Sequence, residues 1–99
     1  MELEMLWADA CELMQQEISL LSYNTWIGTN LKPVAQEGDT VLLSVTMENM
    51  RDHVAQKYQR VIDRCLAMAA NRPIHAEILT SRELEERREG GKTGEQPGL

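Results

Sequence analysis

Val41-Leu42-Leu43-Ser44-Val45 opens the stretch that decides the fold, because apolar side chains alternate along one side of it. Such a period of two predicts a strand. From about Glu48 to Ala70 the apolar residues recur every three to four positions, which predicts a long helix. Asn71-Arg72-Pro73 ends that helix, since proline disfavours the helical conformation at the residue before it. Ile74-His75-Ala76-Glu77-Ile78 alternates again and predicts another strand.

A β-hairpin is predicted just before this stretch. Lys32 to Gln36 forms a short extended run, and its Pro33 suits a strand start or a sheet edge. Glu37-Gly38-Asp39 supplies the turn residues between that run and Val41. The two segments on either side of the turn are therefore expected to pair. The order of the three strands in the sheet is left open by the sequence.

The N-terminal third predicts two helices. Residues 3–18 carry an apolar stripe with helical spacing and no proline or glycine, and a second, short helix is expected from about Leu20 to Ile27. Ser19 is suited to cap the second helix and Gly28 to end it. The stripe of the first helix consists of Leu3, Leu6, Trp7, Ala10, Leu13, Met14 and Ile18.

The predicted element order is α-α-β-β-α-β, an α+β domain over residues 1–80. From Ser81 onward the composition changes: Arg82 to Glu89 is nearly all charged, and Gly90 to Leu99 contains four glycines. Such a segment buries too little apolar surface to offset the entropy of ordering it. We therefore expect residues 81–99 to be a flexible tail, with a frayed helix over Arg82 to Glu89 and disorder from Gly90 to Leu99.

Composition and length exclude several classes of function. The chain has 99 residues, which is one domain, and a formal net charge of −6. A net negative chain repels nucleic-acid phosphate on average. No GxSxG, HExxH or phosphate-binding loop motif is present, and no paired residues suggest a metal site, so we expect neither an enzyme nor a cofactor.

Cys11 and Cys65 lie far apart in the sequence and belong to no CxxC pair. We interpret both as buried thiols in a reducing compartment. The start, Met1-Glu2-Leu3-Glu4, is acidic where a signal peptide has a basic region. No apolar run approaches the roughly 18 residues of a membrane span. These features predict a cytoplasmic location.

One basic cluster has two interpretations. Lys57, Arg60 and Arg64 share a side of the long helix, and such a stripe can contact phosphates. Asp52 and Asp63 flank it, however, and no aromatic side chain interleaves it for base stacking. A solvated helix face is the favoured interpretation, and single-stranded nucleic-acid binding is the alternative.

A set of short blocks resembles a known family. These blocks are Leu6-Trp7, Tyr23-Asn24-Thr25-Trp26-Ile27, Glu37-Gly38-Asp39-Thr40, Arg51-Asp52 and Lys57-Tyr58. Their order and spacing resemble the N-terminal domain of the bacterial replication initiator DnaA over about residues 3–79. The resemblance implies a KH-like α+β fold and a non-enzymatic interaction domain, either as a fragment of an initiator or as a free-standing homologue.

The resemblance also implies which residues contact partners. The first helix would self-associate through Leu3, Leu6 and Trp7, although Trp7 also fits a core position. Partners such as the initiator itself, the replicative helicase or an initiation regulator would meet a second surface, which consists of Ser22, Thr25, Trp26 and Asn49. For Trp26 a core position, and for Asn49 a helix-start role, are the alternatives. The expected function is therefore protein–protein docking in replication initiation.

Overall fold

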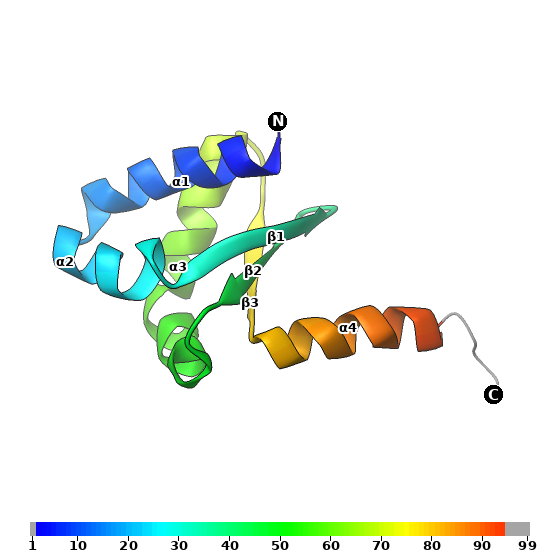
Figure 1. The fold of residues 1–99 in the computed structure, drawn as a ribbon. Helices are drawn as coiled ribbons and strands as arrows, with labels where there is room; N and C mark the ends of the chain where they lie inside the picture. The colour runs from blue at the N-terminus through cyan, green and yellow to red at the C-terminus, as the bar shows by residue number, and fades with distance from the viewer. Residues whose placement is uncertain (1, 95–99) are drawn as a thin grey trace.

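The structure is a computed structural model, and it describes residues 2–94. Its elements follow the predicted order (Figure 1), which confirms the α+β class. They are α1 (Leu3–Glu17), α2 (Leu20–Ser22), η1 (Tyr23–Gly28), β1 (Leu31–Glu37), β2 (Thr40–Val45), η2 (Glu48–Met50), α3 (Arg51–Ala70), β3 (His75–Leu79) and α4 (Ser81–Gly94).

The three strands form one mixed sheet in the order β1-β2-β3. β1 and β2 are the predicted antiparallel hairpin, closed at Gly38, whose φ of 62° suits glycine. β2 and β3 are parallel, with Val41 opposite Ala76 and Leu43 opposite Ile78. A parallel pair needs a crossover connection, and here α3 provides it.

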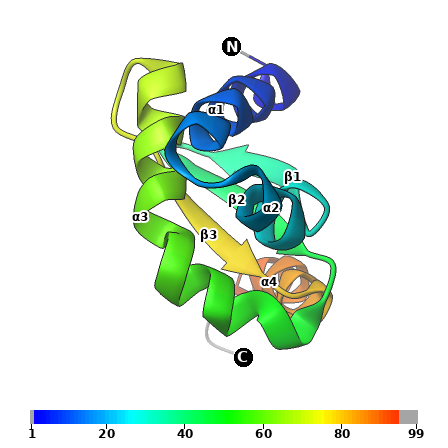
Figure 2. The same cartoon turned by 90° about the vertical axis from the view of Figure 1, so that its left-hand side faces the viewer.

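One face of the sheet carries the main core. α1, η1 and α3 cover that face, as Figures 1 and 2 show from two directions. Cys11 and Cys65 are both buried and free, which confirms their interpretation as buried thiols. The largest fully buried side chains are Leu6, Met14, Ile27, Asn30, Val41, Leu43, Val45, Val54, Ile62, Cys65 and Leu66.

The outer edge of β3 is closed by side chains of α3. Gln59 Nε2 donates to the carbonyl of Ala76 at 2.8 Å, and the backbone N–H of Ala76 donates to Asp63 Oδ1 at 2.7 Å. Arg51 Nη1 donates to the carbonyl of Ile78 at 3.5 Å. An exposed strand edge is a template for unwanted pairing, so these bonds protect the sheet as well as fix α3 to it.

The second predicted helix is present, but it is α-helical only over Leu20–Ser22 and π-helical over Tyr23–Gly28. Ser19 caps it as expected, its Oγ accepting from the N–H of Ser22 at 3.1 Å. From Tyr23 the backbone widens into the π-helical turn η1, which places both Tyr23 and Ile27 in the core. Gly28 lies against the Tyr23 ring, and a Cβ there would stand 2.8 Å from Tyr23 Cε2. The glycine therefore permits this close packing.

α3 ends at Ala70 and is capped by Asn71, so the cause of its end differs from the predicted effect of Pro73. Asn71 adopts a left-handed conformation, with φ 58° and ψ 36°. The N–H of Asn71 donates to the carbonyl of Met68, and that of Arg72 to the carbonyl of Ala67. This is the C-terminal cap that asparagine favours, so the helix stops before the position restricted by Pro73.

Residues 81–94 form helix α4, which includes the segment Arg82–Glu89 where the sequence predicted a frayed helix and continues to Gly94. Its start is a capping box: Thr80 Oγ1 accepts from the N–H of Glu83, and Glu83 Oε1 accepts from the N–H of Thr80. Arg51 pairs with the other oxygen of Glu83 at 3.0 Å. The part of the predicted tail at residues 95–99 lies outside the described residues.

Asn30 is the buried polar residue that joins the N-terminal half to the strand–helix half. Its Nδ2 donates to the carbonyl of Trp26 at 3.2 Å, and its Oδ1 accepts from the N–H of Met47 at 3.0 Å. Its own carbonyl accepts from the N–H of Thr46 at 2.7 Å. The side chain of Asn30 is fully buried, so both of its hydrogen bonds lie at a position without solvent contact for the amide.

We predict that Asn30→Ala lowers the free energy of unfolding by about 2 to 3 kcal/mol, because it leaves a carbonyl and an N–H without partners. Urea denaturation measures this change directly. The matched control is Asn24→Ala, at an exposed position, which we expect to change stability by less than about 0.5 kcal/mol. Equal effects of the two substitutions would contradict the bridging role of Asn30.

Candidate functional site

The residues expected to mediate self-association lie mostly inside the domain. Leu6 and Trp7 are only 2% and 9% exposed, and Leu3 is partly buried against the same core. Trp7 therefore occupies the core position that the sequence left as an alternative. The exposed side of α1 instead carries acidic residues, including Glu4, Asp9 and Glu12.

The residues expected to bind partners surround Trp26. Its indole is partly buried against the core, and its ring lies 4.3 Å from the His53 ring, tilted by 37°. Thr25 is exposed beside it, and Ser22 is partly buried one turn earlier. The π-helical turn explains this placement, because it buries Tyr23 and Ile27 and leaves Trp26 at the rim.

A second segment is held next to Trp26 by Asn30. The same amide that accepts from Met47 N–H donates to the Trp26 carbonyl, so one side chain fixes both segments. Met47 is 41% exposed, and Asn49, in the short turn η2, is exposed as well. We call the resulting area the Trp26 surface; its residues are Thr25, Trp26, Met47, Asn49 and His53.

Sequence reasoning missed Met47 and His53 as members of this surface. His53 follows Asn49 by four residues, a spacing that places two side chains on one side of a helix and that was visible in the sequence. Met47 carried no comparable signal, since its position depends on the hydrogen bond to Asn30.

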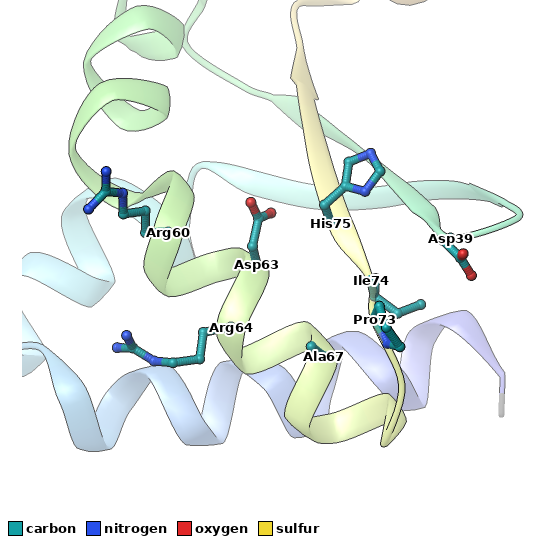
Figure 3. A pocket seen from close by; sticks show the side chains of 8 residues that line it. All are labelled: Asp39, Arg60, Asp63, Arg64, Ala67, Pro73, Ile74 and His75. Carbon is teal, nitrogen blue, oxygen red and sulfur yellow. The ribbon is translucent and has the colours of Figure 1, made fainter.

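The basic stripe does not converge on one point. Arg64 pairs with Glu17 of α1, and the Lys57 ammonium lies 5.5 Å from the centre of the neighbouring Tyr58 ring. Arg60 is exposed, and Figure 3 shows Arg60 and Arg64 projecting from α3 away from Asp39 and His75. This arrangement favours the interpretation of a solvated helix face over a phosphate-binding stripe.

A shallow hollow of about 590 Å³ lies between α3 and the start of β3 (Figure 3). Several of its polar side chains already have partners: Asp39 pairs with Arg72 at 2.6 Å, and His75 Nε2 is 3.0 Å from Thr40 Oγ1. Asp63 accepts from two donors at the β3 edge. The hollow is thus lined by groups that stabilise the fold, and we assign it no ligand.

Glu17 joins the end of α1 to α3. Its carboxylate accepts from the Arg64 guanidinium and, at 3.4 Å, from the Cys65 thiol. The hydrogen bond from Arg64, followed by that from Cys65, lowers the pKa of Glu17 below its usual value. Burial is the main cause that raises the pKa of Cys65 to about 12, and burial also raises the pKa of Cys11. Both thiols therefore stay protonated at neutral pH, as expected for structural cysteines.

Comparison with known proteins finds similarity to a family model and to a curated protein. Residues 4–68 match the family described as the DnaA N-terminal domain. A curated protein, the chromosomal replication initiator protein DnaA of Caldanaerobacter subterraneus subsp. tengcongensis, is 31% identical over 82 residues. That alignment covers 83% of this chain and 18% of the relative, so the chain corresponds to about a fifth of that protein's length. Among the described residues, no helix has the length and apolar character needed to cross a membrane.

We predict that Glu17→Gln lowers the free energy of unfolding at pH 7. The difference in unfolding free energy between the variant and the unaltered chain should become smaller as the pH is lowered. Because the folded-state pKa of Glu17 is depressed, its ion pair stabilises the fold fully above the unfolded-state pKa of about 4.3. That stability is lost as the pH falls through the lower folded-state value.

Urea unfolding at pH 7, 5 and 3.5 tests this pH dependence. Glu12→Gln is the control, since Glu12 is exposed on the same helix. A deficit for Glu17→Gln that stays constant down to pH 3.5 would show that the carboxylate charge is not responsible.

Proposed function

The chain belongs to the DnaA N-terminal domain family, and from this membership we propose that it is a non-catalytic interaction module of chromosome replication initiation. It docks to the replication initiator, to the replicative helicase or to a regulator of initiation. The observation that carries the proposal is the Trp26 surface, where an aromatic side chain at the rim of the core is held in a fixed position.

The Trp26 surface has the features of a small docking site. Partly exposed tryptophans dominate the binding energy of many interfaces, and a side chain already fixed before binding loses little entropy. Trp26 is fixed by the core beneath it and by the His53 ring beside it. Thr25 and Asn49 add uncharged hydrogen-bonding groups around it, which suits a polar rim.

Heterotypic docking is favoured over pairing of two α1 helices. Leu6 and Trp7 of α1 are buried in the core, whereas Met5 is the exposed large apolar side chain of this helix. The outward side presents carboxylates at Glu4, Asp9 and Glu12, and two copies of it would repel each other. Self-association through Leu3, Leu6 and Trp7 would require α1 to move away from the core.

We predict that Asn49→Arg weakens binding to the physiological partner by about tenfold, because it places a large charged side chain on the Trp26 surface without disturbing the core. Isothermal titration calorimetry with purified full-length initiator and, separately, with purified replicative helicase measures the dissociation constants. Urea denaturation should give the same stability for this variant as for the unaltered chain.

Gln16→Arg is the matched control, since it makes the same charge change at an exposed position on α1. We expect it to leave both dissociation constants unchanged. Weakened binding by Gln16→Arg alone would place the docking site on α1 and contradict the proposed function.

A further inference from the structure

The sheet has a second apolar face that lies outside the main core. Leu42 of β2 and Leu79 of β3 are 4% and 7% exposed, yet neither belongs to the core cluster formed with α1 and α3. Side chains alternate along a strand, so these residues face away from the neighbouring core residues Leu43 and Ile78. Strand residues that face water are usually polar. The two apolar side chains of Leu42 and Leu79 therefore indicate that this face of the sheet is covered.

In the free chain α4 covers this face, but with few apolar contacts. Leu84 is the one large apolar residue in the sequence of α4. The described residues of α4 also make ion pairs with the rest of the domain: Arg87 with Glu37 and with Glu77, both at 2.9 Å, and Glu83 with Arg51. Exposed ion pairs contribute little each, so the docking of α4 is weak compared with that of α1 or α3.

α4 also leaves part of the face unfilled. A groove of about 210 Å³ remains between the helix and the hairpin, lined by Val34, Ala35, Glu37, Leu42, Leu84 and Arg87. Val34 sits at the β-bulge of β1, between Pro33 and Ala35, and is 43% exposed. An apolar cavity of about 150 Å³ is enough to hold a benzene ring, so this groove has room for one further large apolar side chain.

We propose that the outer face of the sheet is a second docking surface and that its partner is an amphipathic helix that displaces α4. The partner helix carries two apolar side chains one turn apart, one at the position of Leu84 and one in the groove. It also carries a basic side chain next to them, which takes the place of Arg87 between Glu37 and Glu77. No residue of the Trp26 surface lines this groove, so the inference goes beyond the proposed function.

The chemistry of this partner follows from the helix that already occupies the face. α4 shows that a helix fits against β2 and β3 and that a guanidinium fits between two carboxylates. A partner with two apolar side chains buries more surface than α4 does with one. This additional buried apolar surface allows the partner helix to compete with α4, which is joined to β3 through the single residue Thr80.

The probe is a synthetic peptide with the sequence of residues 80–94 and the substitution Arg88→Leu, which adds an apolar residue four positions after Leu84. We titrate it into the complete 99-residue chain and follow the methyl chemical shifts of Val34, Leu42 and Leu79. Saturable shifts at these methyls are the expected result. In the chain variant Arg87→Glu, α4 loses two ion pairs, and we expect the probe to bind about three to ten times more tightly.

Arg82→Glu is the matched control, because it makes the same charge change on α4, where Arg82 pairs with Glu86 of the same helix. We expect it to leave the affinity for the probe unchanged. The absence of shifts at the three methyls up to millimolar peptide would overturn the proposal. Equal affinities of the Arg87→Glu and Arg82→Glu chains would overturn it as well, since displacement of α4 would then play no part.

Discussion

The parallel pairing of β2 with β3 is the constraint on which the rest of the structure depends. Two parallel neighbours cannot be joined by a tight turn, so the chain between them must cross one face of the sheet, and α3 does so. Its apolar side fills the core, while Gln59 and Asp63 bind the open edge of β3. Because α3 is fixed in this way, α1 packs on it through Glu17. The first turn of α3 is held beside Trp26 through His53.

Hydrophobic periodicity predicted most of the fold, because each buried face leaves a repeat of 2 or 3.6 residues in the sequence. It failed where the determinant was a specific hydrogen bond. Helix α4 has almost no apolar periodicity, and its start is set instead by the capping box Thr80-Ser81-Arg82-Glu83 directly after a strand. The strand order could not be predicted from the periodicity either. It depends on contacts between residues distant in sequence, such as the hydrogen bond from the N–H of Ala76 to Asp63 at the edge of β3.

The candidate sites were predicted less well, because exposure is a property of the packed molecule. Helical spacing placed Trp7 on an apolar stripe without deciding between core and interface, and its burial favours the core. Trp26 reaches the rim only because a π-helical turn shifts it relative to Tyr23 and Ile27. Leu42 was visible as a second apolar side chain on the strand, but only the position of Leu84 explains what covers it.

The central claim is that this domain meets its replication partner through the Trp26 surface and keeps α1 as part of its core. The most direct measurement is a titration of the isotopically labelled chain with the full-length replication initiator of the same organism, followed by backbone amide chemical shifts. We predict shifts concentrated in Tyr23–Gly28 and in residues 47–53, with α1 unchanged. Shifts confined to α1 around Trp7 would contradict the account and show that the first helix leaves the core to bind.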